Sequence, residues 1–572
     1  MGFLEYALSL SLQKDNFKTR IRVNPRFSKP TLVRSEEGFD VDLPVPIALE
    51  EGKIRFLGSE FLADSAGKAR VGRLFRACVF HLTAHTVIPV SVGNFASTQK
   101  RTHVEAFSES IVGDVCVNAY ISSRHPDKLP DLAYANALAF ANMKTAGRIF
   151  NPSTRIMLAS LSKVHIGTVK GKLSLEEEST VEQLTTRLNL LAKDVLMSFN
   201  GKEVNVEEMI RDASDYVMQT IEAYGPILEA PCLPYTEQHG KSTVFIENEV
   251  STDADVEEIF RKSMETYGGM NVSEGSVDSI WKKESDAEAC QAFDTWYSQR
   301  AREQRILEKL KKNGEWDSFK SVEFPEEDVT KYFRARALLS GGSRRLLDSL
   351  RVAQDALDED PGKEMGQLDL SAVIQVLASK KPATDVFMKD EYLSRSFAWT
   401  ILLDVSESMR IKSDFARAVA VCIAEATKEL LMDSGSWTYF AFSDRFYVLK
   451  DASEAYSNRV RARLGGLRFG GLTYMPEAIQ FAGSVLGKRF DEQRFLIVIS
   501  DGWPYGYPDI EAKLSKTISA LQKKGVITIG VGVETDKMKD FFKLSSVILD
   551  AKDLIKDFAK IYANASVAAL ET

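Results

Sequence analysis

The last third of the chain alternates apolar runs with helical segments, and this alternation constrains the fold more than any other feature. The apolar runs are continuous in Val, Ile, Leu and aromatic residues, as in FAWTILLD at 397–404 and RFLIVISD at 494–501. Such runs are typical of strands buried on both faces of a parallel sheet. Strands that alternate with helices predict a doubly wound α/β sheet. Strands are expected at 397–404, 436–443, 494–501, 526–533 and 546–550, and helices at 413–432, from Met475, and at 509–524, 537–542 and 552–566.

Oxygen-bearing side chains follow two of these strands and occupy a glycine-rich turn between them. Asp404, Ser406 and Ser408 come after the first strand, Asp501 comes after the third, and Thr473 lies in the turn RFGGLTYMP. In an open α/β sheet, ligands bind at the edge formed by the carboxyl ends of the strands. Two carboxylates and three hydroxyls are hard oxygen ligands, which suit octahedral Mg²⁺. Either aspartate alone would be equally typical of a helix cap, but three such features in order favour a magnesium site.

The spacing Asp-x-Ser-x-Ser explains how these oxygens can converge. A tight loop after a strand turns alternate side chains to one side, so Glu407, between the two serines, is expected to point away. Glycines at 470, 471 and 502 let the backbone pass close to the site.

The motifs DVSES, GGLT and ISDG, in this order, resemble the metal-ion-dependent adhesion site (MIDAS) of von Willebrand factor A domains. The resemblance covers residues 390–572. It implies a Mg²⁺ bound by Ser406, Ser408 and Thr473, with Asp404 and Asp501 acting directly or through water. It also implies a sixth coordination position that is left open for a carboxylate on a partner protein. The chain departs from many family members at Glu407, where they carry glycine, but this position is not in the ligand set.

The whole chain resembles a group of cytoplasmic proteins in which such a domain follows a long helical region. The group includes NorD-type nitric oxide reductase activation proteins, CbbO-type Rubisco activase subunits and CobT-type cobaltochelatase subunits. The resemblance implies a non-catalytic adaptor that works with a hexameric MoxR-type AAA+ ATPase and binds an acidic residue on its client, a metalloenzyme or a Rubisco-like protein. The alternatives are a CobT-like subunit of a cobalt or magnesium chelatase, and a metal-binding, peptidase-like protein.

The chain before this domain is predicted to be mainly helical. In the predicted helical domain 1–240, residues 1–60 show a mixed pattern without a clear assignment. From Ala69 to about Gly225, apolar residues recur at helical spacing, with breakers such as Pro126, Pro130 and Pro152 between the helices. Residues 241–389 are expected to form an acidic connector, solvated up to about 330, followed by a helical segment. Together with 390–572, this gives three predicted domains. Helices are expected at 69–88, 104–122, 130–147, 153–164, 180–199, 205–223, 287–312, 327–339 and 342–357.

Two histidines in the first of these helices form a second candidate site. His81 and His85 are four residues apart and therefore share one helix face, and Asp114 lies on an apolar stripe of the next helix. The pair resembles a degenerate zincin motif and the metallopeptidase-like helical regions that precede some von Willebrand-type domains, which implies Zn²⁺ bound by His81, His85 and Asp114. Leu82 stands where a working H-E-x-x-H motif has its general base, so peptidase activity is not expected. The simpler interpretation is a hydrogen-bonded pair of core histidines.

Charge and composition exclude several classes of function. The formal net charge is −8, whereas nucleic-acid binding needs a basic surface, so no nucleic-acid partner is expected. Apolar runs stay shorter than the roughly 18 residues of a transmembrane helix, so membrane insertion is not expected. Five scattered cysteines without a CxxC pair, and a first segment that lacks a secretory pattern, predict a cytoplasmic protein without disulfides.

Overall fold

The computed structural model describes residues 2–13, 19–35, 38–49, 52–88, 102–199, 206–238, 242–246, 253–266, 286–313, 318–390, 396–491 and 493–568. The chain forms two compact units, Met1–Arg300 and Ala301–Thr572, which we describe separately. The boundary lies inside helix α10 (Ala287–Asn313). The division into three domains at 1–240, 241–389 and 390–572 stays a prediction.

The second unit is built on a seven-stranded sheet in the order β18-β17-β16-β13-β14-β15-β9. Neighbouring strands are parallel except β14 and β15, which pair antiparallel. The predicted α/β sheet is therefore present, as a mixed sheet. Its strands are β9 (Val322–Glu323), β13 (Phe397–Asp404), β14 (Trp437–Phe442), β15 (Phe446–Lys450), β16 (Gln493–Ser500), β17 (Val526–Val533) and β18 (Leu544–Ile548).

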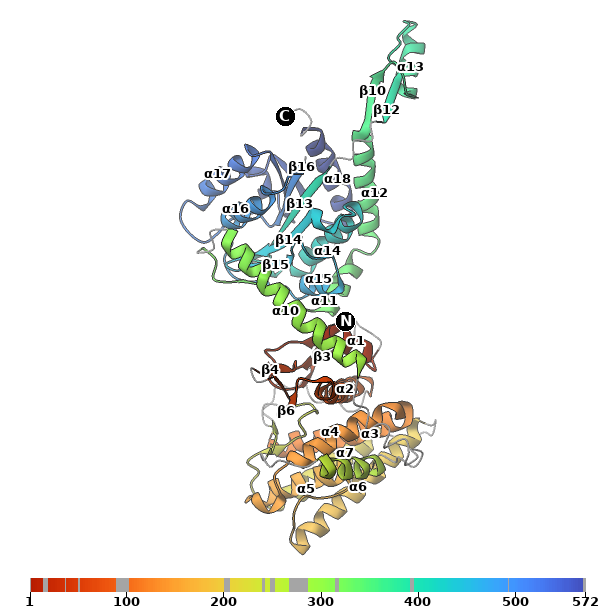
Figure 1. Cartoon of the computed structure of the whole chain (residues 1–572), viewed down its shortest axis with the longest axis vertical. Helices are drawn as coiled ribbons and strands as arrows, with labels where there is room; N and C mark the ends of the chain where they lie inside the picture. Colours follow the sequence, from red (N-terminus) through yellow and green to blue (C-terminus); the bar gives the residue numbers. More distant parts are fainter. Residues whose placement is uncertain are drawn as a thin grey trace. The chain divides into compact units, whose positions relative to one another are not determined.

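Helices cover both faces of this sheet, as Figure 1 shows for α16 and α17 on one side and α14 and α18 on the other. Alternate residues of a strand point to opposite faces, so Ile401 and Leu403 of β13 join the core under α14 and α18, whereas Leu402 joins the core under α16 and α17. Burial on both faces explains why the strands are continuous apolar runs. Besides the end of α10, the helices packed around the sheet are α11 (Val329–Leu338), α12 (Gly342–Asp358), α14 (Ser413–Leu430), α15 (Asn458–Gly465), α16 (Met475–Leu486), α17 (Ile510–Gln522) and α18 (Ala551–Ala568).

Elements that precede residue 390, the predicted start of the α/β domain, also belong to the sheet and core of this unit. Strand β9 forms the edge of the sheet, and Leu346 and Leu350 of α12 are fully buried in its core. A Cβ atom on Gly465 would lie 1.9 Å from the carbonyl oxygen of Asp328, so the backbone of α15 packs directly against the segment that leads into α11. A small antiparallel sheet of β10 (Glu359–Lys363), β12 (Phe387–Asp390) and β11 (Gln367–Leu368), with helix α13 (Leu370–Ser379), is inserted between α12 and β13.

Two details of this unit differ from the sequence prediction. Strand β15 was not expected, and it follows β14 after a short turn where the predicted pattern has no strand. The segment 537–542, expected as a helix, forms only a short 3₁₀ turn at Lys537–Asp540.

The first unit is mainly helical, as predicted. Helices α2 to α7 begin and end within a few residues of the predicted positions, except that α4 ends five residues early and α6 begins five residues early, whereas α1 and α8 were not predicted. They are α1 (Phe3–Leu10), α2 (Ser65–Val87), α3 (His103–Arg124), α4 (Leu129–Asn142), α5 (Pro152–Ile166), α6 (Leu175–Phe199), α7 (Val206–Glu222) and α8 (Asp253–Thr266).

Two small sheets lie between α1 and α2, in the segment whose mixed pattern predicted no element. β3 (Gly38–Leu43) pairs parallel with β1 (Thr19–Val23) and antiparallel with β2 (Thr31–Ser35). The second sheet is the antiparallel series β4 (Ile47–Leu49), β5 (Lys53–Phe56) and β6 (Ser59–Leu62). A further short parallel pair joins β7 (Ala230–Pro231) to β8 (Ser242–Thr243).

Part of the span predicted as a solvated connector is packed instead. Helix α8 buries Val256, Phe260 and Met264, and Ser263 accepts a hydrogen bond of 3.1 Å from Asn136 of α4. The apolar spacing of these residues outweighs the acidic composition of the helix. Residues 247–252 and 268–276, which also belong to the predicted connector, lie outside the described residues. Within the described part of the chain, no helix combines the length and apolarity that crossing a membrane requires.

Candidate metal centres

The predicted magnesium ligands lie where the strand order of the sheet reverses. The chain adds β14 and β15 on one side of β13, and then β16, β17 and β18 on the other side. At such a switch point, the loops after the two central strands separate and leave a crevice at the carboxyl edge of the sheet. Asp404 ends β13, with Ser406 and Ser408 in the loop after it, and Asp501 directly follows β16.

Backbone hydrogen bonds join the three loops that carry these residues. The amide of Glu407 donates to the carbonyl of Gly471 at 3.0 Å, and the amide of Gly470 donates to Val405 at 2.7 Å. Thr473 exchanges two further backbone bonds, of 2.8 and 3.2 Å, with Tyr505 of the loop after β16. The relative positions of the loops are therefore fixed by main-chain contacts as well as by their side chains.

The side chains form two short hydrogen-bonded chains. In the first, Asp404 accepts a bond from the amide of Ser406 at 2.8 Å through Oδ1 and one from the hydroxyl of Ser500 at 2.6 Å through Oδ2. In the second, the hydroxyls of Ser406 and Ser408 lie 3.1 Å apart, and Ser408 donates to Oδ1 of Asp501 at 3.0 Å. We call Asp404, Ser406, Ser408, Thr473 and Asp501 the sheet-edge cluster.

Exposure increases across the cluster from its floor to its mouth. Asp404, Ser406 and Thr473 are buried, Asp501 is half-buried and Ser408 is exposed. Burial raises the pKa of Asp404 to about 6, although hydrogen bonds from Ser406 and Ser500 act in the opposite direction. A buried carboxylate is stabilised by a cation beside it, and the surrounding donors are hydroxyl and carboxylate oxygens, which Mg²⁺ prefers. The donor set therefore fits the predicted ion.

The structure connects four of the five predicted residues by direct hydrogen bonds and places Thr473 in an adjoining loop through its backbone. Glu407 is exposed, and its carboxylate pairs with Arg410 at 2.9 Å. Sequence reasoning missed Ser500, which is fully buried and holds one oxygen of Asp404. Its position directly before Asp501 was the available signal.

We expect alanine at Gly471 to disturb the cluster. Gly471 has a φ of +93°, and a Cβ atom would lie 2.3 Å from Oδ1 of the buried Asp444. Strain and overlap together should lower the free energy of unfolding by about 2 kcal/mol or more, with weaker Mg²⁺ binding. Gly341→Ala is the control, because Gly341 also has a positive φ but open space around it, and it should cost about 1 kcal/mol without affecting Mg²⁺. Thermal unfolding and Mg²⁺ titration of both variants test this, and equal effects would contradict it.

The second candidate site brings together more residues than the three predicted. Helix α2 holds His81 and His85 on one face, and α3 places Asp114 against both, with Oδ1 3.2 Å and 3.4 Å from their Nε2 atoms. Glu237, in the segment after β7, is the addition: its Oε2 lies 3.1 Å from Nε2 of His81 and 3.3 Å from Nε2 of His85. We call these four residues the histidine cluster, and all four are buried.

Contacts outside the histidine cluster hold its carboxylates. Nε2 of His165 lies 3.3 Å from Oδ2 of Asp114, and the hydroxyl of Ser110 donates to Oε1 of Glu237 at 3.3 Å. The ring of Tyr235 packs edge-on against His81 at 5.6 Å. Glu237 and His165 were missed because neither belongs to a periodic pattern with the pair.

Burial and mutual charge act against each other in this cluster. Burial alone would lower the pKa of His85, but the carboxylates of Glu237 and Asp114 together outweigh it and raise that pKa to about 10. Burial would raise the pKa of Glu237, but His85 and His81 together outweigh it and bring that pKa to about 2. The pKa of Asp114 is likewise held well below its ordinary value, because His81, His165 and His85 together outweigh the effect of burial. Both acids are therefore ionised.

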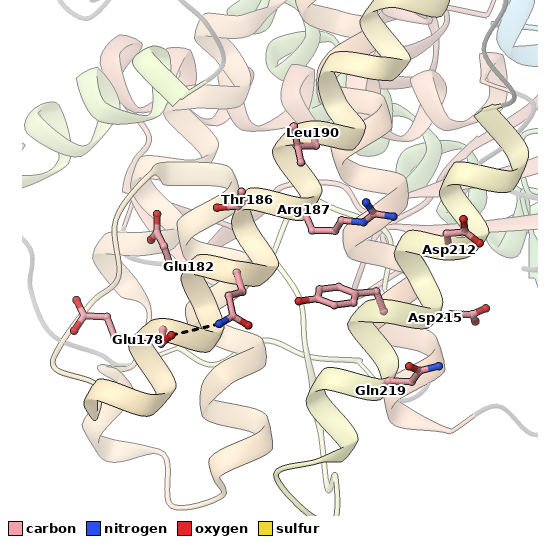
Figure 2. A pocket seen from close by; sticks show the side chains of 11 residues that line it. Glu178, Glu182, Thr186, Arg187, Leu190, Asp212, Asp215 and Gln219 are labelled. Atoms are coloured by element: carbon pink, nitrogen blue, oxygen red, sulfur yellow. Dashed lines mark hydrogen bonds between the residues drawn. The ribbon is translucent and has the colours of Figure 1, made fainter.

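A groove of a different kind lies between α6 and α7 (Figure 2). It is lined by four carboxylates and one guanidinium, together with Tyr216 and Leu190, and every lining side chain is exposed. An exposed groove with excess negative charge is unsuited to a polyanion such as nucleic acid. The residues that line it are Glu178, Ser179, Glu182, Gln183, Thr186, Arg187, Leu190, Asp212, Asp215, Tyr216 and Gln219.

Comparison with known proteins identifies part of the chain. Residues 400–503 match the von Willebrand factor type A domain. An uncharacterized protein of Pseudomonas aeruginosa is 31% identical over 173 residues, which span 28% of this chain and 28% of that protein. Similar solved structures include the PilB minor pilin of Streptococcus sanguinis (TM-score 0.24, 11% identity, 32% of this chain and 66% of that one). Others are proximal thread matrix protein 1 of the mussel byssus (0.25, 14%, 30% and 48%) and the Ro protein of Deinococcus radiodurans (0.21, 12%, 84% and 99%).

Proposed function

We propose that this chain, which carries a von Willebrand factor A domain at residues 400–503, is a non-catalytic, cytoplasmic adaptor. In this proposal the sheet-edge cluster holds Mg²⁺ in the manner of a MIDAS and binds a carboxylate of a partner protein. The observation that carries the proposal is the meeting of Ser406, Ser408 and Asp501 in one hydrogen-bonded chain at the reversal of the strand order. A ligand reaches that point from the carboxyl edge of the sheet.

Each residue of the cluster has a distinct task in this proposal. Asp404 is fixed by Ser406 and Ser500, so its charge stays at the buried floor of the site. The hydroxyls of Ser406, Ser408 and Thr473 supply neutral oxygens that leave much of the ion's charge uncompensated. When bound, the ion supplies a strong, directional contact to an incoming carboxylate. The exposed Ser408 and half-buried Asp501 border the side from which that carboxylate would arrive.

The finer proposal concerns the partners. The resemblance to NorD-, CbbO- and CobT-type proteins favours a hexameric MoxR-type AAA+ ATPase as the source of energy. It favours as client a metalloenzyme or a Rubisco-like protein with an accessible acidic residue. The adaptor would bind the client through the metal, and the ATPase would remodel the client.

Affinity capture from the source organism tests this proposal. Tagged full-length chain should retain a MoxR-type ATPase and its client in Mg²⁺ plus ATP, and should lose the client in EDTA. Ser408→Ala should lose the client to the same extent, because it removes one predicted ligand from the mouth of the site. Glu407→Gln is the matched control, since it alters the same exposed loop outside the ligand set, and it should retain the client.

Two outcomes would contradict the proposal. The same partners recovered in EDTA, or with Ser408→Ala, would show that capture does not use the metal site. Recovery of a large chelatase subunit together with a tetrapyrrole would favour the chelatase alternative instead.

A further inference from the structure

The ligand atoms of the histidine cluster are arranged as the corners of a tetrahedron. The four atoms are Nε2 of His81, Nε2 of His85, Oδ1 of Asp114 and Oε2 of Glu237. Five of the six distances between them are 3.1–3.4 Å, and the sixth, between the two carboxylate oxygens, is at most 4.8 Å. A point equidistant from all four therefore lies about 2.0–2.4 Å from each, close to Zn–N and Zn–O bond lengths of roughly 2.0–2.2 Å.

Hydrogen bonds among the four side chains do not account for this arrangement. The two Nε2 atoms lie 3.2 Å apart, so at most one of them can carry a hydrogen toward the other. Neither oxygen of Asp114 receives an aligned hydrogen bond, although three ring nitrogens lie within 3.4 Å of them. Buried polar atoms without aligned partners call for an explanation such as a bound ion. Here the nitrogens and oxygens converge on a common point between them.

Charge and donor chemistry identify the class of ion. A metal ion displaces the protons of the two imidazoles when it binds. The neutral imidazoles and the two carboxylates then carry a charge of −2, which one divalent cation cancels inside the protein. Nitrogen ligands in a tetrahedron are typical of Zn²⁺, whereas Mg²⁺ and Ca²⁺ take six or more oxygen ligands. His165 and Ser110 contact the outer oxygens of Asp114 and Glu237, as the second shell of a metal site does.

From this geometry we propose that His81, His85, Asp114 and Glu237 bind one Zn²⁺ in a closed, structural site. Four protein ligands complete the tetrahedron and leave no position for water, which separates a structural zinc from a catalytic one. The ligands are buried, so no substrate reaches them. Glu237, 156 residues along the chain from His81, makes the site a cross-link between α2, α3 and the segment after β7.

The segment that carries Glu237 is positioned independently of any ion. The hydroxyl of Tyr235 donates to Oδ1 of Asn136 at 2.7 Å, and the amide of Gln238 donates to the carbonyl of Pro30 at 2.9 Å. These bonds on either side of Glu237 place its carboxylate beside the histidines. The zinc would therefore bind to a largely preformed set of ligands.

Metal analysis of the full chain tests the zinc proposal. Protein purified from zinc-supplemented medium should contain about one zinc per chain, and removal by a strong chelator should lower the melting temperature. Replacement by Co²⁺ should give the intense visible absorption of tetrahedral coordination. Glu237→Gln, which keeps the side-chain volume, should reduce the zinc content at least tenfold. His125→Ala changes a histidine outside the cluster, and Asp404→Asn changes the sheet-edge cluster, so both should retain zinc.

Several results would overturn the proposal. They are wild-type protein without zinc, a melting temperature that responds to neither zinc nor chelator, and zinc retained in full by Glu237→Gln. A weak, octahedral Co²⁺ spectrum would exclude the closed tetrahedron. If Glu237→Gln does not fold, the wild-type zinc content and Co²⁺ spectrum still decide the question. None of these readouts depends on the proposed adaptor function.

Discussion

Replacing Arg463 with methionine is expected to lower the free energy of unfolding of the second unit by about 3 kcal/mol, because it breaks a buried ion pair. The side chain of Arg463 is 1% exposed and donates to Glu303 at 2.8 Å, to Glu454 at 3.0 Å and to the carbonyl of Leu449 at 2.9 Å. Its guanidinium also lies 4.2 Å from the ring centre of Phe324. Methionine fills the space but leaves these acceptors without their donor.

The expected loss of unfolding free energy, about 3 kcal/mol, lies at the lower end of the range for a broken buried ion pair. The reason is that Glu303 keeps a second ion pair with Arg459 at 2.9 Å. Arg468→Met is the matched control. Arg468 is 73% exposed and pairs with Glu326 at 2.6 Å, so its replacement should cost no more than about 1 kcal/mol. Hydrogen exchange of the β13 and β16 peptides in rising urea would report on the second unit alone. Equal effects of the two substitutions would contradict the account.

The contacts of Arg463 also bear on where the von Willebrand-type domain begins. Glu303 and Phe324 lie well before residue 390, where the von Willebrand-type domain was predicted to begin. Because both contact Arg463 of α15, a fragment that starts at 390 would lack the same stabilising contacts. Sequence reasoning could not find this, since the contacts join segments about 140–160 residues apart.

The sheet was predictable because burial on both faces leaves a continuous apolar run. The runs at 397–404 and 526–533 coincide with β13 and β17. Strand β15 was missed because it returns antiparallel beside β14, whereas the expected alternation places a helix after each strand. Strand β9 has only two residues, too few for any pattern.

In the first unit, the sequence pattern of one strand was overlooked, and one residue of the histidine cluster had no sequence pattern at all. TRIRV of β1 alternates buried and half-buried residues, a period of two that the sequence displays and that predicts a strand. For Glu237 there was no such signal, because its place beside His81 depends on how distant segments pack. The helical spacing fixed His81 and His85 on one face, and the stripe on α3 indicated Asp114, but the fourth ligand required the structure.

Replacing Asp404 with asparagine is expected to weaken Mg²⁺ binding by at least about 100-fold, because even residues behind metal ligands contribute about 10- to 100-fold. Asparagine keeps the size of the side chain and can still accept the bond from the amide of Ser406, so the loop should remain folded. The substitution removes the negative charge from the buried floor of the site. Glu407→Gln removes the same charge three residues away, from an exposed side chain that pairs with Arg410, and should leave binding unchanged.

Isothermal titration of the full chain with Mg²⁺ tests this most directly. One Mg²⁺ should bind per wild-type chain and per Glu407→Gln chain, whereas Asp404→Asn should show no measurable uptake. Absence of Mg²⁺ uptake by the wild type, or equal uptake by Asp404→Asn, would show that the sheet-edge cluster is not a magnesium site.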